Sequence, residues 1–339
     1  MKLWFKSGGW AGRRARGVAA SINPDEVKSI AVIRHAAVGD MVLTRPFLIE
    51  LRRFFPNAAI TLSLCSNYTR GAPEELVDRV HVVYGSDRKD VPLKAQIARA
   101  RELGEHDLLF DLAVTPRSFY TCLLTRTKLK ISFPYKAIER HLFYDVAVQR
   151  SDFQFEADNI LDTLRILGHR VEYPPQFLMP VESYQHPRPY LVYFPSASTP
   201  KKCWPKGHFS RLVDALSVKH PEYDHIILKG ISEWETIDEI VDPLADRENV
   251  IAMQLNDFDE TLSFVRGATL LIGNDTGIRN IAIACETPTV GVFFDTEPYR
   301  YWPRYGLHDA VFCSDAQVPD VDAVQSSVEG LLVSLNNKQ

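Results

Sequence analysis

The residue pattern with the clearest chemistry is a turn of small and polar residues at positions 273–277, which reads GNDTG. It follows a short apolar run at 269–272 and precedes apolar residues at helical spacing. A helix that begins at Thr276 and Gly277 presents unpaired backbone N–H groups and the positive end of its dipole, which suits a phosphate. The alternative is an ordinary strand-to-helix turn that Asp275 or Thr276 caps.

A second turn of the same kind lies near the start of the chain. The apolar run 29–34 reads SIAVIR and is followed by HAAVGD, in which Gly39 and Asp40 precede a helical pattern. Two strand–turn–helix units, each with a glycine and an aspartate at the turn, suggest two similar halves that face each other across a cleft.

Strands and helices alternate around the first turn. The pattern predicts strands at 29–34, 59–64, 79–84, 107–112 and 129–133, and helices at 40–55, 92–103, 116–124 and 152–167. The strands are short and apolar on both faces, as in a parallel sheet covered by helices. Such sheets bind ligands beyond the carboxyl ends of their strands, where Gly39, Asp40 and the loop 113–117 lie.

Five prolines in the segment 171–189 resist regular structure and predict a linker. Beyond it the alternation resumes, with predicted strands at 190–194, 224–228, 250–252, 269–272 and 289–293, and helices at 207–219, 233–244, 257–266 and 276–285. A terminal helix follows at 318–335, and we expect it to cross back to the first domain.

Composition places the chain among ordinary globular proteins of two domains, with 339 residues, 45% hydrophobic and 24% charged residues. No apolar run approaches the roughly 18 residues that cross a membrane. The five cysteines form no CxxC pair and indicate reduced thiols, so we expect a cytoplasmic protein. The first turn lacks the GxGxxG fingerprint of a nicotinamide oxidoreductase.

The charge is unevenly distributed although the net charge is only −4. Residues 1–24 hold five basic residues and no acidic one, and residues 117–141 hold six basic residues and one acidic residue. Each patch indicates either an anionic partner or a solvated face. We expect residues 1–24, which also contain Trp4 and Trp10, to form a basic arm that contacts an anionic inner-membrane surface peripherally or a disordered tail.

Three stretches resemble one protein family. They are IAVIRHAAVGDMVLTRPFLIELRRFFPNAAIT (30–61), PSASTPKKCWPKGHFSRLVDAL (195–216) and LIGNDTGIRNIAIACETPTVGVFFDTEPYRYWP (271–303). Their G-D turn, their lysine before Trp-Pro and their G-N-D-[ST]-G motif resemble the bacterial lipopolysaccharide heptosyltransferases, glycosyltransferase family nine. The resemblance covers most of residues 28–312.

The resemblance implies an α/β fold of the GT-B type, with two Rossmann-like parallel-sheet domains facing across a cleft. We expect a basic arm at 1–24, an acceptor-binding domain at 25–170, a linker at 171–189, a donor-binding domain at 190–317 and the C-terminal helix at 318–339. No cofactor, metal or nucleic-acid partner is implied.

The implied reaction is inverting transfer of a sugar, heptose from ADP-heptose, to a lipopolysaccharide core or related surface glycan. Asp40 matches the family's general base, which takes the proton of the acceptor hydroxyl. The alternative role of Asp40 is a helix N-cap. Two other functions stay open: transfer of another nucleotide sugar, and a non-catalytic homologue that binds a nucleotide sugar.

The resemblance also assigns binding residues. Lys202 precedes Trp-Pro, with Lys201 beside it, and either Glu233 or Glu235 matches an acid that binds the ribose. The full donor set is Ser198, Lys202, Glu233, Glu235, Asp275, Thr276, Gly277 and Asn280. Two positions depart from the family: Asn280 stands where a histidine is usual, and Ser196 where a glycine is usual.

The basic segment after the fourth predicted strand matches the region that holds the anionic acceptor, which carries acidic Kdo sugars and phosphates. Charge-assisted contacts would fix its pose. The acceptor set is Gly39, Arg117, Arg126, Lys130 and Lys136, with Arg117 first.

Overall fold

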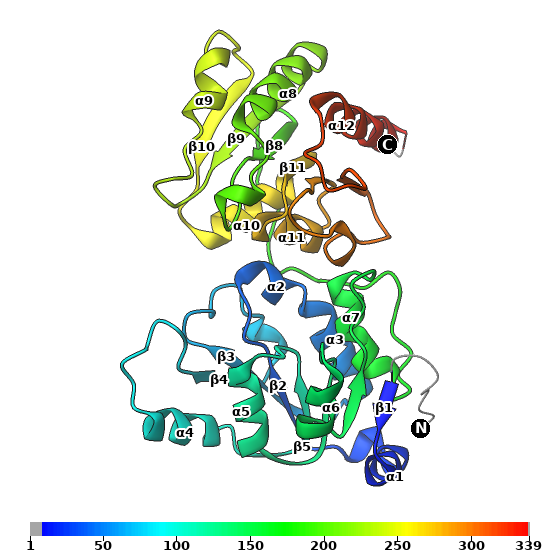
Figure 1. The fold of residues 1–339 in the computed structure, drawn as a ribbon. Helices are drawn as coiled ribbons and strands as arrows, with labels where there is room; N and C mark the ends of the chain where they lie inside the picture. Colours follow the sequence, from blue (N-terminus) through cyan, green and yellow to red (C-terminus); the bar gives the residue numbers. More distant parts are fainter. Residues whose placement is uncertain (1–8, 338–339) are drawn as a thin grey trace. The chain divides into compact units, whose positions relative to one another are not determined.

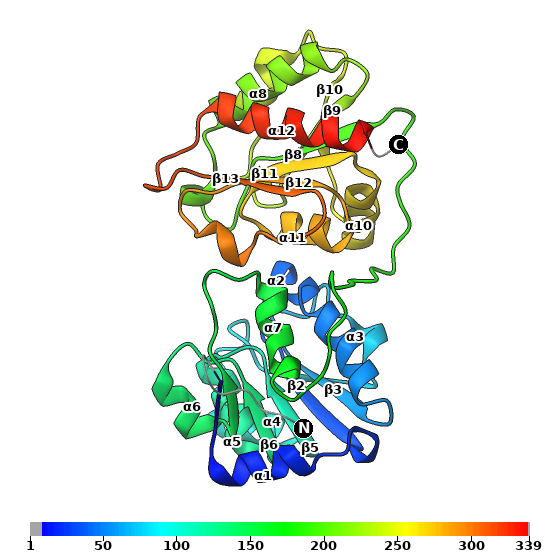
Figure 2. The same cartoon turned by 90° about the vertical axis from the view of Figure 1, so that its right-hand side faces the viewer.

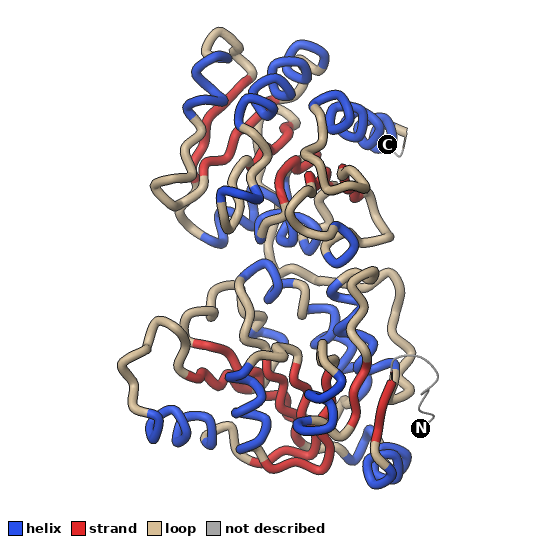
Figure 3. The backbone as a smooth tube through the Cα atoms, in the orientation of Figure 1, coloured by secondary structure: helices blue, strands red, loops and turns tan. Residues whose placement is uncertain are grey.

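The computed structural model describes residues 9–337, without the side chains of residues 137, 140 and 141. The chain divides into two compact units, Met1–Phe177 and Leu178–Gln339. In each unit the strands form one sheet and helices pack against it (Figures 1, 2 and 3). The division falls inside the segment 171–189 that the prolines predict as a linker.

The first unit contains a sheet of seven strands in the order β1-β7-β6-β5-β2-β3-β4, parallel except for the pair β1 and β7. The strands are β1 (Gly9–Ala11), β2 (Ser29–Ile33), β3 (Ala59–Cys65), β4 (Arg79–Val83), β5 (Glu105–Asp111), β6 (Arg126–Ser132) and β7 (Val146–Val148). The helices are α1 (Arg13–Ser21), α2 (Val38–Val42), α3 (Arg45–Phe54), α4 (Leu93–Arg101), α5 (Pro116–Leu124), α6 (Ala137–Phe143) and α7 (Glu156–Arg165).

The second unit contains a parallel sheet of six strands in the order β10-β9-β8-β11-β12-β13. The strands are β8 (Tyr190–Phe194), β9 (Asp224–Lys229), β10 (Val250–Gln254), β11 (Leu270–Asn274), β12 (Thr289–Val292) and β13 (His308–Val311). The helices are α8 (Lys206–Lys219), α9 (Asp238–Val241), α10 (Phe258–Gly267), α11 (Gly277–Ala284) and α12 (Val321–Asn336).

Both sheets reverse their strand order at one point. In the first sheet the chain runs outward from β2 to β3 and β4 and then returns to the other side of β2 with β5. In the second sheet it runs from β8 to β9 and β10 and returns beside β8 with β11. Parallel sheets bind ligands beyond the strand ends at such a switch point, so the loops after β2, β5, β8 and β11 are the places to look for a site.

The expected arm at 1–24 is wrong for the described residues from Gly9 onward. Strand β1 pairs with β7, and α1 buries Ala15 and Ala19 in the core of the first unit. These small side chains let the basic helix lie close to the sheet while its arginines are exposed. The charge pattern of the sequence does not show this packing. The expected membrane contact of residues 1–8 lies outside the described residues.

The terminal helix does not cross back to the first domain as expected. Its stripe of Val321, Val324, Val328 and Leu332 belongs to the core of the second unit, together with residues of α8, β11 and β12. An apolar stripe on a helix does not by itself say which neighbouring surface covers it.

Two predicted helices are interrupted. The helix expected at 40–55 is divided into α2 and α3, and Pro46 lies in the first turn of α3, where its missing N–H costs no helical hydrogen bond. The helix expected at 233–244 shrinks to the four residues of α9 and a short 3-10 turn at Asp242–Leu244. Among residues 9–337, no helix is both long and apolar enough to cross a membrane.

Candidate active site

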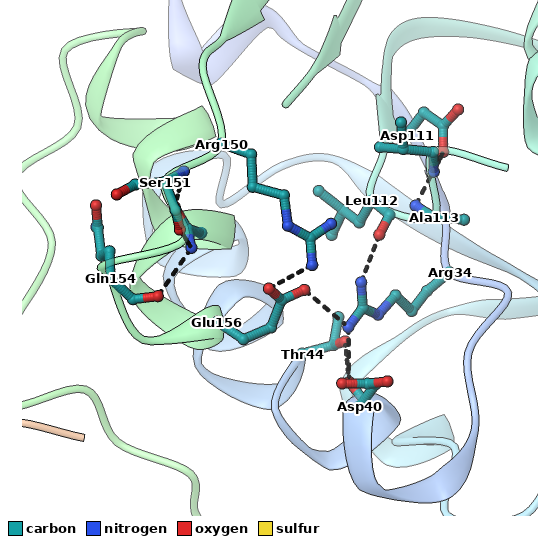
Figure 4. Close-up of polar contacts among 12 residues, drawn as sticks. Arg34, Asp40, Thr44, Asp111, Leu112, Ala113, Arg150, Ser151, Gln154 and Glu156 are labelled. Carbon is teal, nitrogen blue, oxygen red and sulfur yellow. Dashed lines mark hydrogen bonds and ion pairs between the residues drawn. The ribbon is translucent and has the colours of Figure 1, made fainter. Parts of the chain in front are cut away.

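Asp40 lies inside the first turn of α2, at the switch point of the first sheet. Ala37 is the N-cap of this helix, so the alternative role of Asp40 as an N-cap is wrong. Asp40 is half-buried and the neighbouring Gly39 is buried. The backbone carbonyl of Asp40 accepts hydrogen bonds from Arg34 Nη2 at 3.0 Å and Thr44 Oγ1 at 3.2 Å (Figure 4).

Two of the predicted acceptor residues lie at the same edge of the sheet as Asp40. Arg117 is exposed in the first turn of α5, after the carboxyl end of β5, and Lys136 is exposed after the carboxyl end of β6. Because β2, β5 and β6 are parallel, these loops leave the sheet on one side.

The assignment of Arg126 to that edge is wrong. Arg126 begins β6, opposite Glu105 at the start of β5, and forms an ion pair with that glutamate at 3.1 Å. Lys130 lies in the middle of β6. Since a strand rises about 3.3 Å per residue, Arg126 lies roughly 20 Å from the carboxyl edge. The charge run was visible in the sequence, but its path across the sheet was not.

A buried histidine that sequence reasoning missed lies beside Arg117. His35 follows β2, is 7% exposed, and neither ring nitrogen has a hydrogen-bond partner among the described residues. Burial, aided by the positive charges of Arg117 and His81, lowers the pKa of His35 to about 3. Arg117 Nη1 donates to Cys65 Sγ at 3.2 Å, so the loops after β2, β3 and β5 meet here.

The second site begins where β11 meets α11. Thr276 is the N-cap of α11 and its side chain makes no capping hydrogen bond. The carboxylate of Asp275 instead accepts a hydrogen bond from Lys202 Nζ at 3.0 Å. The alternative of a turn capped by the Thr276 side chain is therefore wrong, and that side chain does not occupy the N–H groups at the start of α11.

The asparagine of the GNDTG motif holds this site together. Asn274 Oδ1 accepts a hydrogen bond from the backbone N–H of Trp204 at 2.9 Å, and its Nδ2 donates to the carbonyl of Pro195 at 2.7 Å. Both partners lie in the loop that follows β8 and carries Ser198 and Lys202. Asn274 thus fastens the loop after β8 to the end of β11, across the switch point.

Trp204 anchors the same loop through its buried side chain. Its side chain is fully buried and its indole N–H donates to the carbonyl of Pro319 at 2.8 Å. The Trp-Pro pair of the sequence therefore positions Lys202, and Ser198 remains exposed in the same loop.

Arg279 is a fully buried arginine in the first turn of α11. Its Nη1 donates to the carbonyl of Tyr301 at 2.6 Å and its guanidinium lies over the Phe293 ring, 5.0 Å from the centroid. Its Nε and Nη2 have no hydrogen-bond partner among the described residues. Burial lowers the pKa of Arg279 to about 10, which leaves the side chain charged at neutral pH.

The register of the sheet places this guanidinium at the ligand edge. Gly273 pairs with Gly291 and Asn274 with Val292, so Asp275 and Phe293 lie at the same level, just beyond the strand ends. Asn280, the next residue of α11, is 4% exposed and its Oδ1 also lacks a partner among the described residues. Sequence reasoning named Asn280 but left Arg279 out of the site.

The two glutamates after β9 differ in their surroundings. Glu233 is exposed, whereas Glu235 is half-buried and accepts a hydrogen bond from the backbone N–H of Ser232 at 2.8 Å. The choice between them for a ribose remains a prediction. Within the described part of the chain, no group of three or more His, Cys, Asp or Glu side chains is placed to hold a metal ion.

Comparison with known proteins agrees with this geometry. The model of glycosyltransferase family 9 (heptosyltransferase) matches residues 103–329, well over half of the chain. "Lipopolysaccharide heptosyltransferase 3" of Escherichia coli is 24% identical over 287 residues, which are 78% of this chain and 82% of that protein.

Solved structures share the fold. A family 9 glycosyl transferase from Veillonella parvula superposes with a TM-score of 0.74 at 18% identity and covers 92% of this chain and 99% of its own. The heptosyltransferase WaaC of E. coli, solved with ADP-2-deoxy-2-fluoro heptose, gives a TM-score of 0.71 at 17% identity, over 89% of this chain and 99% of its own. The chain therefore belongs to glycosyltransferase family 9, the heptosyltransferase family, and is a glycosyltransferase with two parallel-sheet units of the GT-B type.

Proposed function

We propose that this protein transfers heptose from ADP-heptose to a lipopolysaccharide core or a related surface glycan, with inversion at the anomeric carbon. The names of two similar proteins support the donor and the acceptor: a lipopolysaccharide heptosyltransferase, and a heptosyltransferase solved with an ADP-heptose analogue. The order of the motifs along the chain supports the same reading.

The observation that carries the proposal is the positive site at the start of α11. Lys202 and Arg279 bring two positive charges close to the carboxylate of Asp275, beside a helix start whose N-cap side chain makes no capping hydrogen bond. A leaving diphosphate needs such compensation as the bond to the sugar breaks. Buried cations act strongly there because little water screens them.

In the proposed reaction Asp40 takes the proton of the acceptor hydroxyl while that oxygen forms a bond to the anomeric carbon. The bond from the anomeric carbon to the diphosphate oxygen breaks, and ADP leaves with its electron pair. Arg117 and Lys136, at the edge of the sheet that Asp40 occupies, hold the carboxylates and phosphates of the acceptor. Lys202, Arg279 and the helix N–H groups supply the positive charge, so we propose a transfer that needs no metal.

The test is thermal stabilisation of the protein by ADP, ADP-heptose, UDP and UDP-sugars, followed by transfer assays with and without EDTA. A ligand at about 100 times its Kd adds roughly 2.7 kcal/mol to the free energy of unfolding. We expect a clear shift with ADP and ADP-heptose, and a transfer rate that EDTA leaves unchanged. Stabilisation by UDP ligands alone would reject ADP-heptose as donor.

Asn280 favours a second candidate. The family usually has a histidine there, so transfer of another nucleotide sugar by the same scaffold is the alternative. A sugar nucleotide outside the ADP series that both stabilises the protein and is turned over would establish it. Stabilisation without turnover of any donor would instead indicate a homologue that only binds.

A further inference from the structure

The carbonyl of Asp40 is held by a buried arginine that none of the assigned roles uses. The side chain of Arg34, directly after β2, is 4% exposed. Its Nη2 donates to the carbonyl of Asp40 at 3.0 Å, and its Nη1 donates to the carbonyl of Leu112 beyond β5 (Figure 4). One side chain therefore ties the short helix α2 to the ends of both strands at the switch point.

Helix α2 needs such a tie because it has only five residues. A helix of this length satisfies few of its own carbonyls. The N–H of Thr44 bonds to the carbonyl of Met41, and the side chains of Arg34 and Thr44 both donate to the carbonyl of Asp40. Of these, only Arg34 also reaches another element of the sheet.

Arg34 is itself held by α7. Glu156, the first residue of that helix, is 1% exposed and lies 3.5 Å from Arg34 Nη2 and 2.5 Å from Arg150 Nη2. The positive end of the α7 dipole favours a carboxylate at this position. The guanidinium of Arg150 lies 4.4 Å from the centroid of the Tyr135 ring, which fixes the far side of the cluster.

Stability alone explains this cluster poorly. Two arginines carry two positive charges against the one negative charge of Glu156, and burying charges costs several kcal/mol per ion. Apolar side chains of similar volume commonly replace buried ion pairs without loss of stability. A guanidinium has one property that they lack: a single planar group can donate to the carbonyls of Leu112 and Asp40 and also pair with the carboxylate of Glu156.

We propose that Arg34 is a positioning residue for the general base, and that Glu156 and Arg150 hold it in place. Arg34 sets the orientation of α2 and through it the direction of the Asp40 carboxylate. The inference rests on the proposed role of Asp40 and adds the element that keeps this carboxylate aligned with an acceptor hydroxyl.

The test compares Arg34→Met with a matched control, Arg45→Met. The Arg45 side chain is also 4% exposed, but it donates to the carbonyl of Phe177 at 2.7 Å and pairs with Glu75 at 2.6 Å. We expect kcat to fall about 10- to 100-fold in Arg34→Met with an unchanged KM for the donor, because misalignment by about 1 Å costs up to that much. Arg34→Lys should recover part of the rate, whereas Arg45→Met should keep kcat.

Hydrogen exchange of the amides at 38–44 gives a readout that does not depend on turnover. We expect faster exchange in this segment for Arg34→Met and wild-type exchange for Arg45→Met. Unchanged exchange at 38–44 in Arg34→Met, or equal losses of kcat in the two variants, would overturn the inference. A wild-type protein that transfers no sugar would reject the proposed function alone, since the exchange comparison still decides whether Arg34 holds α2.

Discussion

Helices α2 and α11 each follow one of the two strands that meet at the switch point of their sheet, β2 in the first unit and β11 in the second, and the charged groups around them differ. Around α2 the two buried arginines, Arg34 and Arg150, are tied to a glutamate and to backbone carbonyls, and the half-buried Asp40 is a carboxylate. Around α11 the aspartate is engaged by Lys202, and Nε and Nη2 of the buried Arg279 have no hydrogen-bond partner among the described residues.

The difference shows how similar turns can be suited to two tasks, the proposed proton transfer at Asp40 and the proposed phosphate binding beside Asp275. The residue types of the turn do not distinguish the two sites, because both turns contain a glycine and an aspartate. The two aspartates differ in the group that contacts them from another part of the chain. Lys202 binds the carboxylate of Asp275, whereas Arg34 binds the backbone carbonyl of Asp40. Each site can therefore be disabled without disturbing the other.

The largest effect is expected for Asp40→Asn. Removing a general base lowers kcat about 10²- to 10⁴-fold. The proposed donor residues belong to the other unit, so the affinity for ADP should stay the same. Initial rates of transfer and calorimetric titration with ADP on the same preparation check this. Loss of ADP binding in Asp40→Asn would contradict the separation of the two tasks.

Lys202→Met should give the reverse outcome. A hydrogen bond to a charged group contributes about 1.5–3 kcal/mol, so we expect the Kd for ADP to rise roughly 10- to 100-fold. Titration calorimetry measures it. Lys201→Met is the control, because Lys201 is 70% exposed and pairs with Asp295 at 3.2 Å instead. Equal weakening in both variants would show that general positive charge, not the Lys202–Asp275 pair, binds the diphosphate.

Arg117→Ala against Arg126→Ala tests the corrected acceptor edge. We expect the KM for an anionic acceptor to rise about 3- to 10-fold in Arg117→Ala, in line with one exposed charge-assisted contact. Arg126→Ala should keep the wild-type KM because its ion pair lies at the far edge of the sheet. A rise of this KM in both variants would show that Arg126 also contributes to acceptor binding.

An effect on stability rather than on activity is expected in acid, and it concerns a histidine in each unit. Burial lowers the pKa of both His35 and His308 to about 3, and a neighbouring arginine adds to it in each case. The unfolded chain, with an ordinary pKa near 6.5, binds more protons, so this stability is complete above about pH 6.5 and is lost as the pH falls towards 3. Each histidine contributes a slope of up to about 1.4 kcal/mol per pH unit.

Urea unfolding at about pH 7.5 and about pH 5 measures this dependence. His35→Gln and His308→Gln should each lose less stability than the wild type between the two conditions. A variant whose loss matches that of the wild type would show that its histidine is protonated in the folded protein.

The sequence allowed prediction of what is local. The turns, most of the strands, and the role of Thr276 and Gly277 as the start of a helix follow from residue types a few positions apart. Long-range contacts were out of reach: nothing in the spacing links Arg34 to Glu156, or Asn274 to Trp204. The same limit explains the errors. A run of basic residues does not reveal that Arg126 begins β6 whereas Lys136 lies beyond the other end of that strand. An apolar stripe does not reveal which unit α12 packs against.

The side chain of Arg279 occupies the space that a side chain at position 291 would need. A Cβ atom at Gly291 would lie 2.3 Å from Arg279 Nε, so no side chain fits there while the arginine keeps its place. Position 291 can therefore gain a side chain only if position 279 loses its arginine. A family member with alanine or a larger residue at the first position should have a short side chain at the second, and grafting Arg279 into such a chain should fail unless the glycine is grafted with it.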